Sequence, residues 1–206
     1  MEDTEQRQSP LGMALACEVG LGVTALAVGQ MVGFWPLDRF TWSALAVGQG
    51  LLATAPLVIA MWLATRWPIG PLKALGDLVR DLIVPIFAGV PWWQLAIISI
   101  AAGWGEEVLF RGLIQAGTES QTDSSGFALI LASVIFGLAH PLSTAYVVMA
   151  AAIGAYLGWL FIATDNLLPA IVAHAAYDFV ALVYLLVHYS VPTTSDSSET
   201  TRDDGS

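Results

Sequence analysis

The amino-acid sequence predicts an all-α membrane protein: a polytopic bundle of about six transmembrane helices, with one amphipathic helix at the membrane interface. Hydrophobic residues make up 56% of the 206 residues and charged residues only 12%, whereas soluble domains carry about 25% charged residues. Several apolar stretches approach or exceed the roughly 20 residues that a helix needs to cross a bilayer. Composition and segment length together predict a single transmembrane domain over residues 11–190.

Both ends of the chain are polar. Residues 1–10 are predicted to be a polar N-terminal tail, and residues 191–206 an acidic, disordered C-terminal tail rich in Ser, Thr and Asp. Much of the net charge of −10 lies in these two ends. Because the sequence contains no basic stripe, we do not expect nucleic acid as a partner.

The predicted spans follow in order along the chain. The first covers Leu11–Trp35 and the second Trp42–Thr65. In residues 66–90, charged side chains alternate with apolar ones at helical spacing, which is typical of an amphipathic helix lying in the interface; a cytoplasmic linker helix is the alternative. The other four spans are expected at Trp92 to about Gln115, Phe127–His140, Ser143–Ala163 and Leu167–Tyr189, with a polar loop over Gln115–Gly126.

The basic residues predict the orientation. If the N-terminal end is cytoplasmic, Arg39 alone faces outward, and the following basic residues face the cytoplasm: Arg7, Arg66, Lys73, Arg80 and Arg202. The positive-inside rule therefore favours both termini in the cytoplasm. The expected location is the inner (plasma) membrane.

The stretch Gly103–Gly112 places Glu106, Glu107 and Arg111 within an apolar run. Ionisable residues inside a membrane are costly and indicate a functional site. Residues four apart share a helix face, so Glu107 can pair with Arg111, whereas Glu106 points about 100° away. We therefore predict a structural Glu107–Arg111 pair and a free, reactive Glu106.

Two later spans each carry a histidine. His140 follows Phe136 by four residues, and His174 precedes Asp178 by four. Counting helical rise puts Glu106 and His174 both about 20 Å from the inner face, with His140 roughly one turn away. We expect these residues to share one site. Glu18, in the first span, is either functional or a protonated carboxyl that snorkels to the interface.

A carboxylate and two imidazoles in a water-accessible pocket suit hydrolysis. Glu106 can act as general base on a water, with a histidine sharing the proton. The second histidine and Asp178 are suited to orienting an oxyanion or to binding a metal, and two histidines with a carboxylate are a standard ligand set for zinc. Zn²⁺ is therefore a candidate cofactor, with candidate ligands His140, His174, Asp178 and Glu106.

These motifs resemble those of the CPBP family of intramembrane proteases, which includes CAAX prenyl proteases, bacteriocin-processing enzymes and Abi-like proteins. Residues 106–111, Glu-Glu-Val-Leu-Phe-Arg, are similar to its EExxxR motif. Phe136–His140 is similar to FxxxH, and His174–Asp178 to the third motif, HxxxN or HxxxD. The resemblance covers about residues 92–190.

The resemblance implies a multi-helix intramembrane endopeptidase in which Glu106 and His140 activate water, while His174 and residue 178 support the oxyanion. The family's eukaryotic CAAX-processing members carry Asn where this chain has Asp178. Because an ionised Asp cannot donate a hydrogen bond to an oxyanion, metal binding or orientation of His174 suits Asp178 better.

The predicted function is hydrolysis of a peptide bond in a membrane-associated protein or peptide. The alternative is a non-enzymatic membrane protein, such as a bacteriocin immunity factor or scaffold, that uses the same residues structurally. A metal or proton transporter fits the midplane charges but is disfavoured, because the sequence shows no internal repeat.

Overall fold

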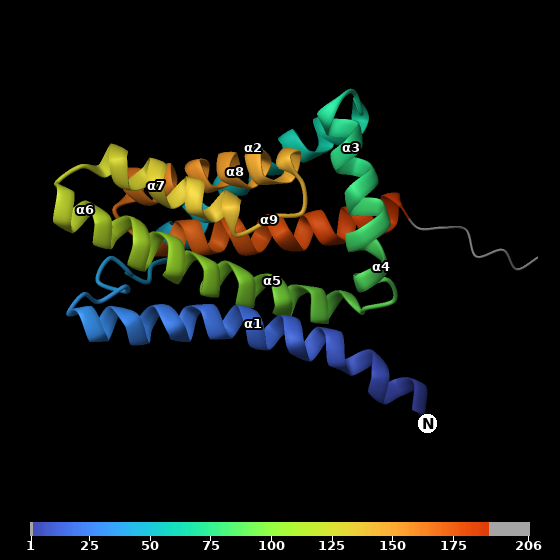
Figure 1. Ribbon diagram of the computed structural model, residues 1–206, viewed down its shortest axis with the longest axis horizontal. Helices are drawn as coiled ribbons and strands as arrows, with labels where there is room; N and C mark the ends of the chain where they lie inside the picture. Colours follow the sequence, from blue (N-terminus) through green and yellow to red (C-terminus); the bar gives the residue numbers. More distant parts are fainter. Residues whose placement is uncertain (1, 190–206) are drawn as a thin grey trace, which may run out of the picture.

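The computed structural model describes residues 2–189, with side chains from residue 11 onward, and this part of the chain is helical without any strand. The predicted all-α class is confirmed. The acidic tail predicted over residues 191–206 lies outside the described residues. Figure 1 shows the long helices running side by side in one bundle.

The helices follow one another in a simple order. Their bounds are α1 Glu2–Val32, α2 Ala44–Arg66, α3 Pro71–Leu78, α4 Val84–Phe87, α5 Trp92–Glu107, α6 Ala116–Thr122, α7 Ser125–Leu138, α8 Thr144–Thr164 and α9 Leu167–His188. Two wider π-helical segments join neighbouring helices: η1 at Val79–Ile83 links α3 to α4, and η2 at Val108–Gln115 links α5 to α6.

Four helices are long and apolar enough to cross a membrane: α1 from Leu11 onward, α2, α8 and α9. These match the predicted first, second, fifth and sixth spans to within a few residues. The expected count of six is not reached. Trp92–Thr122 qualifies only together with Pro71–Phe87, from which it is bent by 113°, and α7 has only 14 residues. Residues 2–189 therefore contain four clear spans, or five if the bent pair counts as one.

The physical reason for this difference lies in the third and fourth predicted spans. The run from Trp92 to Thr122 is helical throughout, but it contains Glu106, Glu107 and Arg111, which lower its hydropathy. α7 is strongly apolar but ends at Leu138, shortly before Pro141, which cannot continue a helix.

The polar loop predicted over residues 115–126 was wrong in extent. Helix continues through α6 to Thr122, and the turn consists of Asp123 and Ser124. Asp123 has φ of 50°, a left-handed conformation that Asp tolerates better than most residues. Ser124 then caps α7 by accepting a hydrogen bond from the backbone N–H of Phe127. The predicted N-terminal tail is likewise helical from Glu2, where its backbone continues α1.

The segment α3–α4 crosses one end of the bundle at a steep angle to the long helices (Figure 1). Its Lys73 pairs with Asp77 at 2.6 Å, and Arg80 pairs with Asp77 at 3.0 Å, while Leu72 and Leu82 are exposed apolar side chains. This division of charged and apolar surface suits a helix lying in the membrane interface. The first described residues of α1 and the last of α9 lie at this same end.

Helix α5 is central to the bundle, with α1 and α9 both packed against it. Two glycines make this close packing possible. A Cβ on Gly103 would come within 2.8 Å of the Ala175 Cβ on α9, and a Cβ on Gly105 would collide with the Glu18 carbonyl oxygen on α1. The backbones of α1 and α9 therefore approach α5 within three residues of Glu106.

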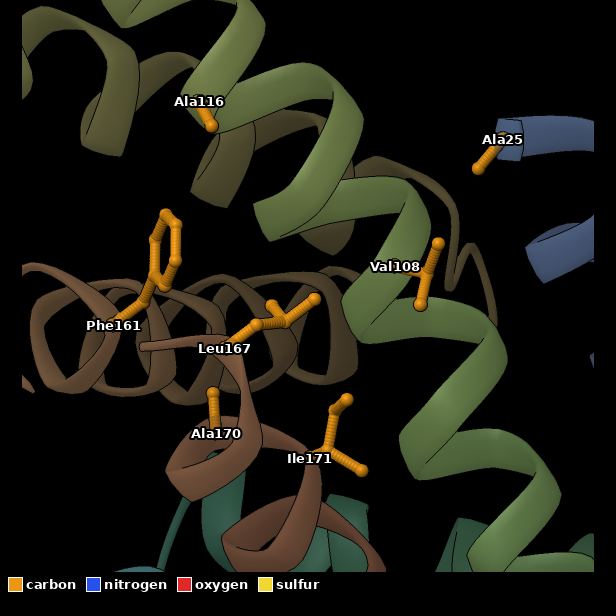
Figure 2. Packing of buried hydrophobic residues seen from close by; sticks show 7 residues of the cluster. All are labelled: Ala25, Val108, Ala116, Phe161, Leu167, Ala170 and Ile171. Atoms are coloured by element: carbon orange, nitrogen blue, oxygen red, sulfur yellow. The ribbon is translucent and has the colours of Figure 1, made fainter. Parts of the chain in front are cut away.

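A buried apolar cluster continues from this crossing toward the α6 end of the bundle. Figure 2 shows that α1, the α5–η2–α6 helix, α8 and α9 all contribute side chains to it. Its members are Ala25, Val108, Ala116, Phe161, Leu167, Ala170 and Ile171. Val108 is fully buried and directly follows Glu107, so the packing of this cluster fixes the rotation of the helix that carries the acidic pair.

Candidate active site

Glu107 and Arg111 form the ion pair that their spacing predicted. Arg111 Nη1 donates to Glu107 Oε1 at 2.6 Å, with both side chains almost fully buried. Arg111 Nη2 also donates to the Gly154 carbonyl at 2.8 Å, and its guanidinium lies 4.6 Å from the centre of the Phe136 ring. The buried charge is thus compensated by a carboxylate, a carbonyl and an aromatic face.

The same Glu107 oxygen also holds His174, a contact that the sequence analysis did not foresee. His174 Nδ1 lies 2.8 Å from Glu107 Oε1. Because an ionised carboxylate only accepts hydrogen bonds, the His174 proton resides on Nδ1. Its Nε2 lies 3.9 Å from Glu106 Oε2 and 3.5 Å from Asp178 Oδ2, so it faces two carboxylates.

His140 is oriented in a comparable way. It lies just beyond the end of α7, and its Nδ1 is 2.8 Å from the Phe136 carbonyl oxygen. A carbonyl oxygen is an acceptor, so Nδ1 carries the His140 proton. Its Nε2 then faces Glu106, 3.8 Å from Oε1. Two separate elements therefore turn the Nε2 atom of an imidazole toward one carboxylate.

Glu106 lies between these two imidazoles. Its side chain is only 10% exposed, and its Oε2 has no hydrogen-bond partner among the described residues. Separations of 3.8 and 3.9 Å are too long for direct hydrogen bonds, but a water to one side can bond to both partners. The structure thus brings together the three residues predicted to be catalytic.

Phe136 connects the parts of the site. Its ring centre lies 4.9 Å from that of Phe110, 4.8 Å from His140 and 6.0 Å from His174. The sequence motif identified Phe136 only by its spacing from His140. In the structure, one ring packs against both histidines and the Arg111 guanidinium, so it positions all three.

Asp178 and Glu18 lie at the edge of this group. Asp178 is 32% exposed and faces His174, as expected for one helical turn on α9. Glu18 belongs to α1, and its carbonyl oxygen occupies the space next to Gly105, the residue before Glu106. The sequence left its role open, and the only available signal was a single carboxylate in an apolar span. The structure places it beside the other acids.

The spacing of the site residues can be compared with that of the ligands of a zinc ion. Neighbouring ligand atoms of a tetrahedral zinc with bonds of about 2.0–2.1 Å lie roughly 3.3 Å apart. The nitrogen–oxygen separations around Glu106 are longer, at 3.8 and 3.9 Å. In the described part of the chain, no group of three or more His, Cys, Asp or Glu side chains is arranged to hold a metal. As placed, these residues do not form a zinc site.

Comparison with known proteins gave one match. Residues 88–180 match a family model described as type II CAAX prenyl endopeptidase, Rce1-like. The matched region contains Glu106, His140, His174 and Asp178, but it excludes α1 and therefore Glu18. Neither a curated protein nor a solved structure matches the chain.

Proposed function

We propose that the chain is an intramembrane endopeptidase acting on a membrane-associated protein or peptide, on the premise that residues 88–180 match the model of the Rce1-like type II CAAX prenyl endopeptidases. The observation that carries the proposal is the convergence of the Nε2 atoms of His140 and His174 on the buried Glu106 carboxylate, at 3.8 and 3.9 Å. A carboxylate flanked by two imidazoles is suited to removing a proton from water.

Glu106 is the proposed general base. It takes a proton from a water as the water oxygen attacks the carbonyl carbon of the peptide bond. His140 accepts a hydrogen bond from the same water and so orients it. The proton then passes to the peptide nitrogen as the carbon–nitrogen bond breaks. General acid–base catalysis of this kind contributes about 10²–10⁴-fold to a rate.

His174 is proposed to act on the oxyanion. With its Nδ1–H held by Glu107, its Nε2 can receive a proton and then donate a hydrogen bond to the developing negative charge. A carboxylate behind the imidazole stabilises the resulting imidazolium, as in Ser-His-Asp hydrolases. Asp178 is an acceptor only, so its proposed role is to orient His174 rather than to bind the oxyanion.

The membrane setting completes the proposal. We place the α3–α4 end of the bundle, which carries Lys73 and Arg80, at the cytoplasmic face of the inner (plasma) membrane. Both termini then lie in the cytoplasm. The substrate is a peptide or protein that reaches the bilayer, and a CAAX-terminated, prenylated chain is the candidate that the family name suggests.

The test uses the full chain purified in detergent, with Glu106→Gln as the main variant. Substrates are first identified by comparing membrane peptides from cells with and without the protein; CAAX-terminated peptides, prenylated and unprenylated, are assayed beside them. Glu106→Gln keeps the side-chain shape and should lower cleavage by about 10²–10⁴-fold. Glu119→Gln is the control, because Glu119 pairs with Arg39 outside the site, and it should keep full activity.

Three outcomes of this assay distinguish the alternatives. Retained activity in Glu106→Gln would rule out Glu106 as the base. A wild type that cleaves nothing, together with unfolding of Glu106→Gln, would favour a scaffold or immunity factor. Loss of wild-type activity in chelator, with recovery on adding Zn²⁺, would show that zinc is required, whereas full activity in chelator would support the Glu106 mechanism.

A further inference from the structure

Helix α1 contributes a carboxylate to the site from outside the family region. Glu18 lies next to the point where α1 meets α5, because its own carbonyl oxygen occupies the space that a Gly105 side chain would need. Gly105 immediately precedes Glu106. Glu18 is half-buried, and its Oε2 is a buried oxygen to which no described residue donates a hydrogen bond.

The charges around Glu106 are unevenly distributed. His140 approaches from the end of α7, where it contacts Glu106 Oε1. Glu18 approaches from α1, and Figure 1 shows α1 and α7 on opposite sides of the α5 helix. Asp178 belongs to α9, which meets α5 at Gly103, two residues from the crossing of α1 and α5 at Gly105. Glu106 thus has His140 on its α7 side and the carboxylate-bearing helix α1 on the opposite side, while Asp178 lies 3.5 Å from His174 Nε2. The mostly buried Glu106 Oε2 has no hydrogen-bond partner among the described residues.

Peptide hydrolysis produces two charges of opposite sign. Water adds its hydroxyl to the carbonyl carbon, the carbon–nitrogen bond breaks, and both protons of the water end on the amine side. The products are one carboxylate and one ammonium group, with atoms and charge balanced. A site with a basic and an acidic side separates these products, because each charge is stabilised by its opposite.

We propose that Glu18, together with Asp178, binds the amine end of the cleaved bond and stabilises the ammonium group as it forms. This assignment rests on the proposed endopeptidase function and makes Glu18 a catalytic residue that the family region lacks. A buried carboxylate oxygen without a donor is unfavourable. An ammonium group supplies three donors and a compensating charge.

The experiment compares two versions of the C-terminal product peptide of the assay substrate, one with a free amine and one N-acetylated. Both are measured as inhibitors of the full-length wild type, Glu18→Gln and Glu18→Asp. In wild type the free amine should bind more tightly. Glu18→Gln should weaken the free amine about 10- to 100-fold, as expected for a charge-assisted hydrogen bond, and leave the acetylated peptide unchanged. Glu18→Asp should restore part of the difference.

A second readout uses an ester analogue of the substrate, whose leaving group is an alcohol and never becomes an ammonium. Glu18→Gln should lower kcat for the peptide about tenfold or more and leave ester cleavage within about twofold of wild type. Equal losses on both substrates, or equal weakening of both inhibitors, would mean that Glu18 is structural and would overturn the proposal.

The two proposals fail in different ways. Failure of the endopeptidase function appears in the wild type, which would cleave neither substrate, or in an active Glu106→Gln. The Glu18 assignment can fail only if the wild type cleaves the substrate. It fails when Glu18→Gln weakens the binding of the free-amine and the acetylated peptide equally. Val19→Ala is the control on α1, since Val19 is exposed. It should change neither the ratio of the affinities for the two inhibitors nor the ratio of peptide to ester cleavage.

Discussion

One atom, Glu107 Oε1, accepts hydrogen bonds from both Arg111 and His174. Sequence spacing alone predicted the first contact, because both residues belong to one helix. It could not predict the second, because His174 lies on α9 and the rotation of that helix depends on packing against α5. The same limit applies to Glu18, whose proximity to Glu106 arises from a crossing of helices at Gly105.

Variants of the Glu107–Arg111 pair should separate the effect of this pair on stability from its effect on activity. Arg111→Met leaves the buried Glu107 charge uncompensated and should lower the free energy of unfolding by about 3–5 kcal/mol. The double variant Glu107→Gln/Arg111→Met removes both charges, so it should recover most of that stability. It should not recover cleavage, because His174 loses the carboxylate that stabilises its protonated form.

Denaturation in detergent and the cleavage assay measure the two effects. Lys73→Met is the control, because the Lys73–Asp77 pair has the same spacing but is exposed, and it should leave both measurements unchanged. A double variant as unstable as Arg111→Met alone would show that the buried charge is not the source of the loss.

At the scale of helices, the sequence predicted most boundaries well. Long apolar spans begin at N-caps such as Ser43 and Asn166, which accept hydrogen bonds from the following backbone. The helix that carries the site was harder to predict. It continues through η2 and α6 despite its charged and polar residues, because η2 is held by Arg111 and by Gln115, which donates to the Gly158 carbonyl at 3.1 Å.

The element-scale prediction concerns the crossing of α1 and α5. Gly105→Ala places a methyl group against the Glu18 carbonyl, a backbone atom that cannot move alone. The variant should be destabilised by about 1–3 kcal/mol, as for other overpacked sites. It should also lose the preference for free-amine product that we assign to Glu18. Denaturation and inhibitor binding check the two effects.

Gly48→Ala is the matched control in α2, because a Cβ there meets no atom within 4 Å. It should be neutral or stabilising by up to about 1 kcal/mol, since Ala favours helix over Gly. Equal behaviour of the Gly105 and Gly48 variants would contradict the close contact between α1 and α5.

At the scale of the whole molecule, composition was sufficient to predict the membrane bundle, and length sufficed for four of its spans. The described residues contain fewer spans than the six predicted, because the prediction took every apolar run of the sequence as a span. α7 has only 14 residues, and the helix with Glu106 carries charges that a lipid-facing span would not. Both surround the site, where protein rather than lipid covers the polar groups.

The topology prediction uses single cysteines on a Cys17→Ser background. Lys73→Cys lies on α3 and Asp123→Cys in the turn between α6 and α7, at opposite ends of the bundle (Figure 1). In intact cells an impermeant thiol reagent should label Asp123→Cys and spare Lys73→Cys. In inverted membrane vesicles the pattern should reverse.

Disruption of the membrane should make both cysteines reactive, and the Cys17→Ser parent should stay unlabelled throughout. Labelling of Lys73→Cys alone in intact cells would invert the proposed orientation. Labelling of both in intact cells would contradict a bundle that crosses the membrane.

Because one oxygen of Glu107 makes two contacts, substitutions at this residue affect two properties of the protein at once. Glu106 has a proposed role in chemistry alone and Ala25 is part of the buried apolar cluster alone, so each can be optimised for a single purpose. Glu107 Oε1 anchors the buried guanidinium and aligns the imidazole at once. A substitution of Glu107 that changes the reactivity of His174 therefore also changes the stability of the fold. A redesign of the site has more freedom at Glu18 and Asp178 than at Glu107.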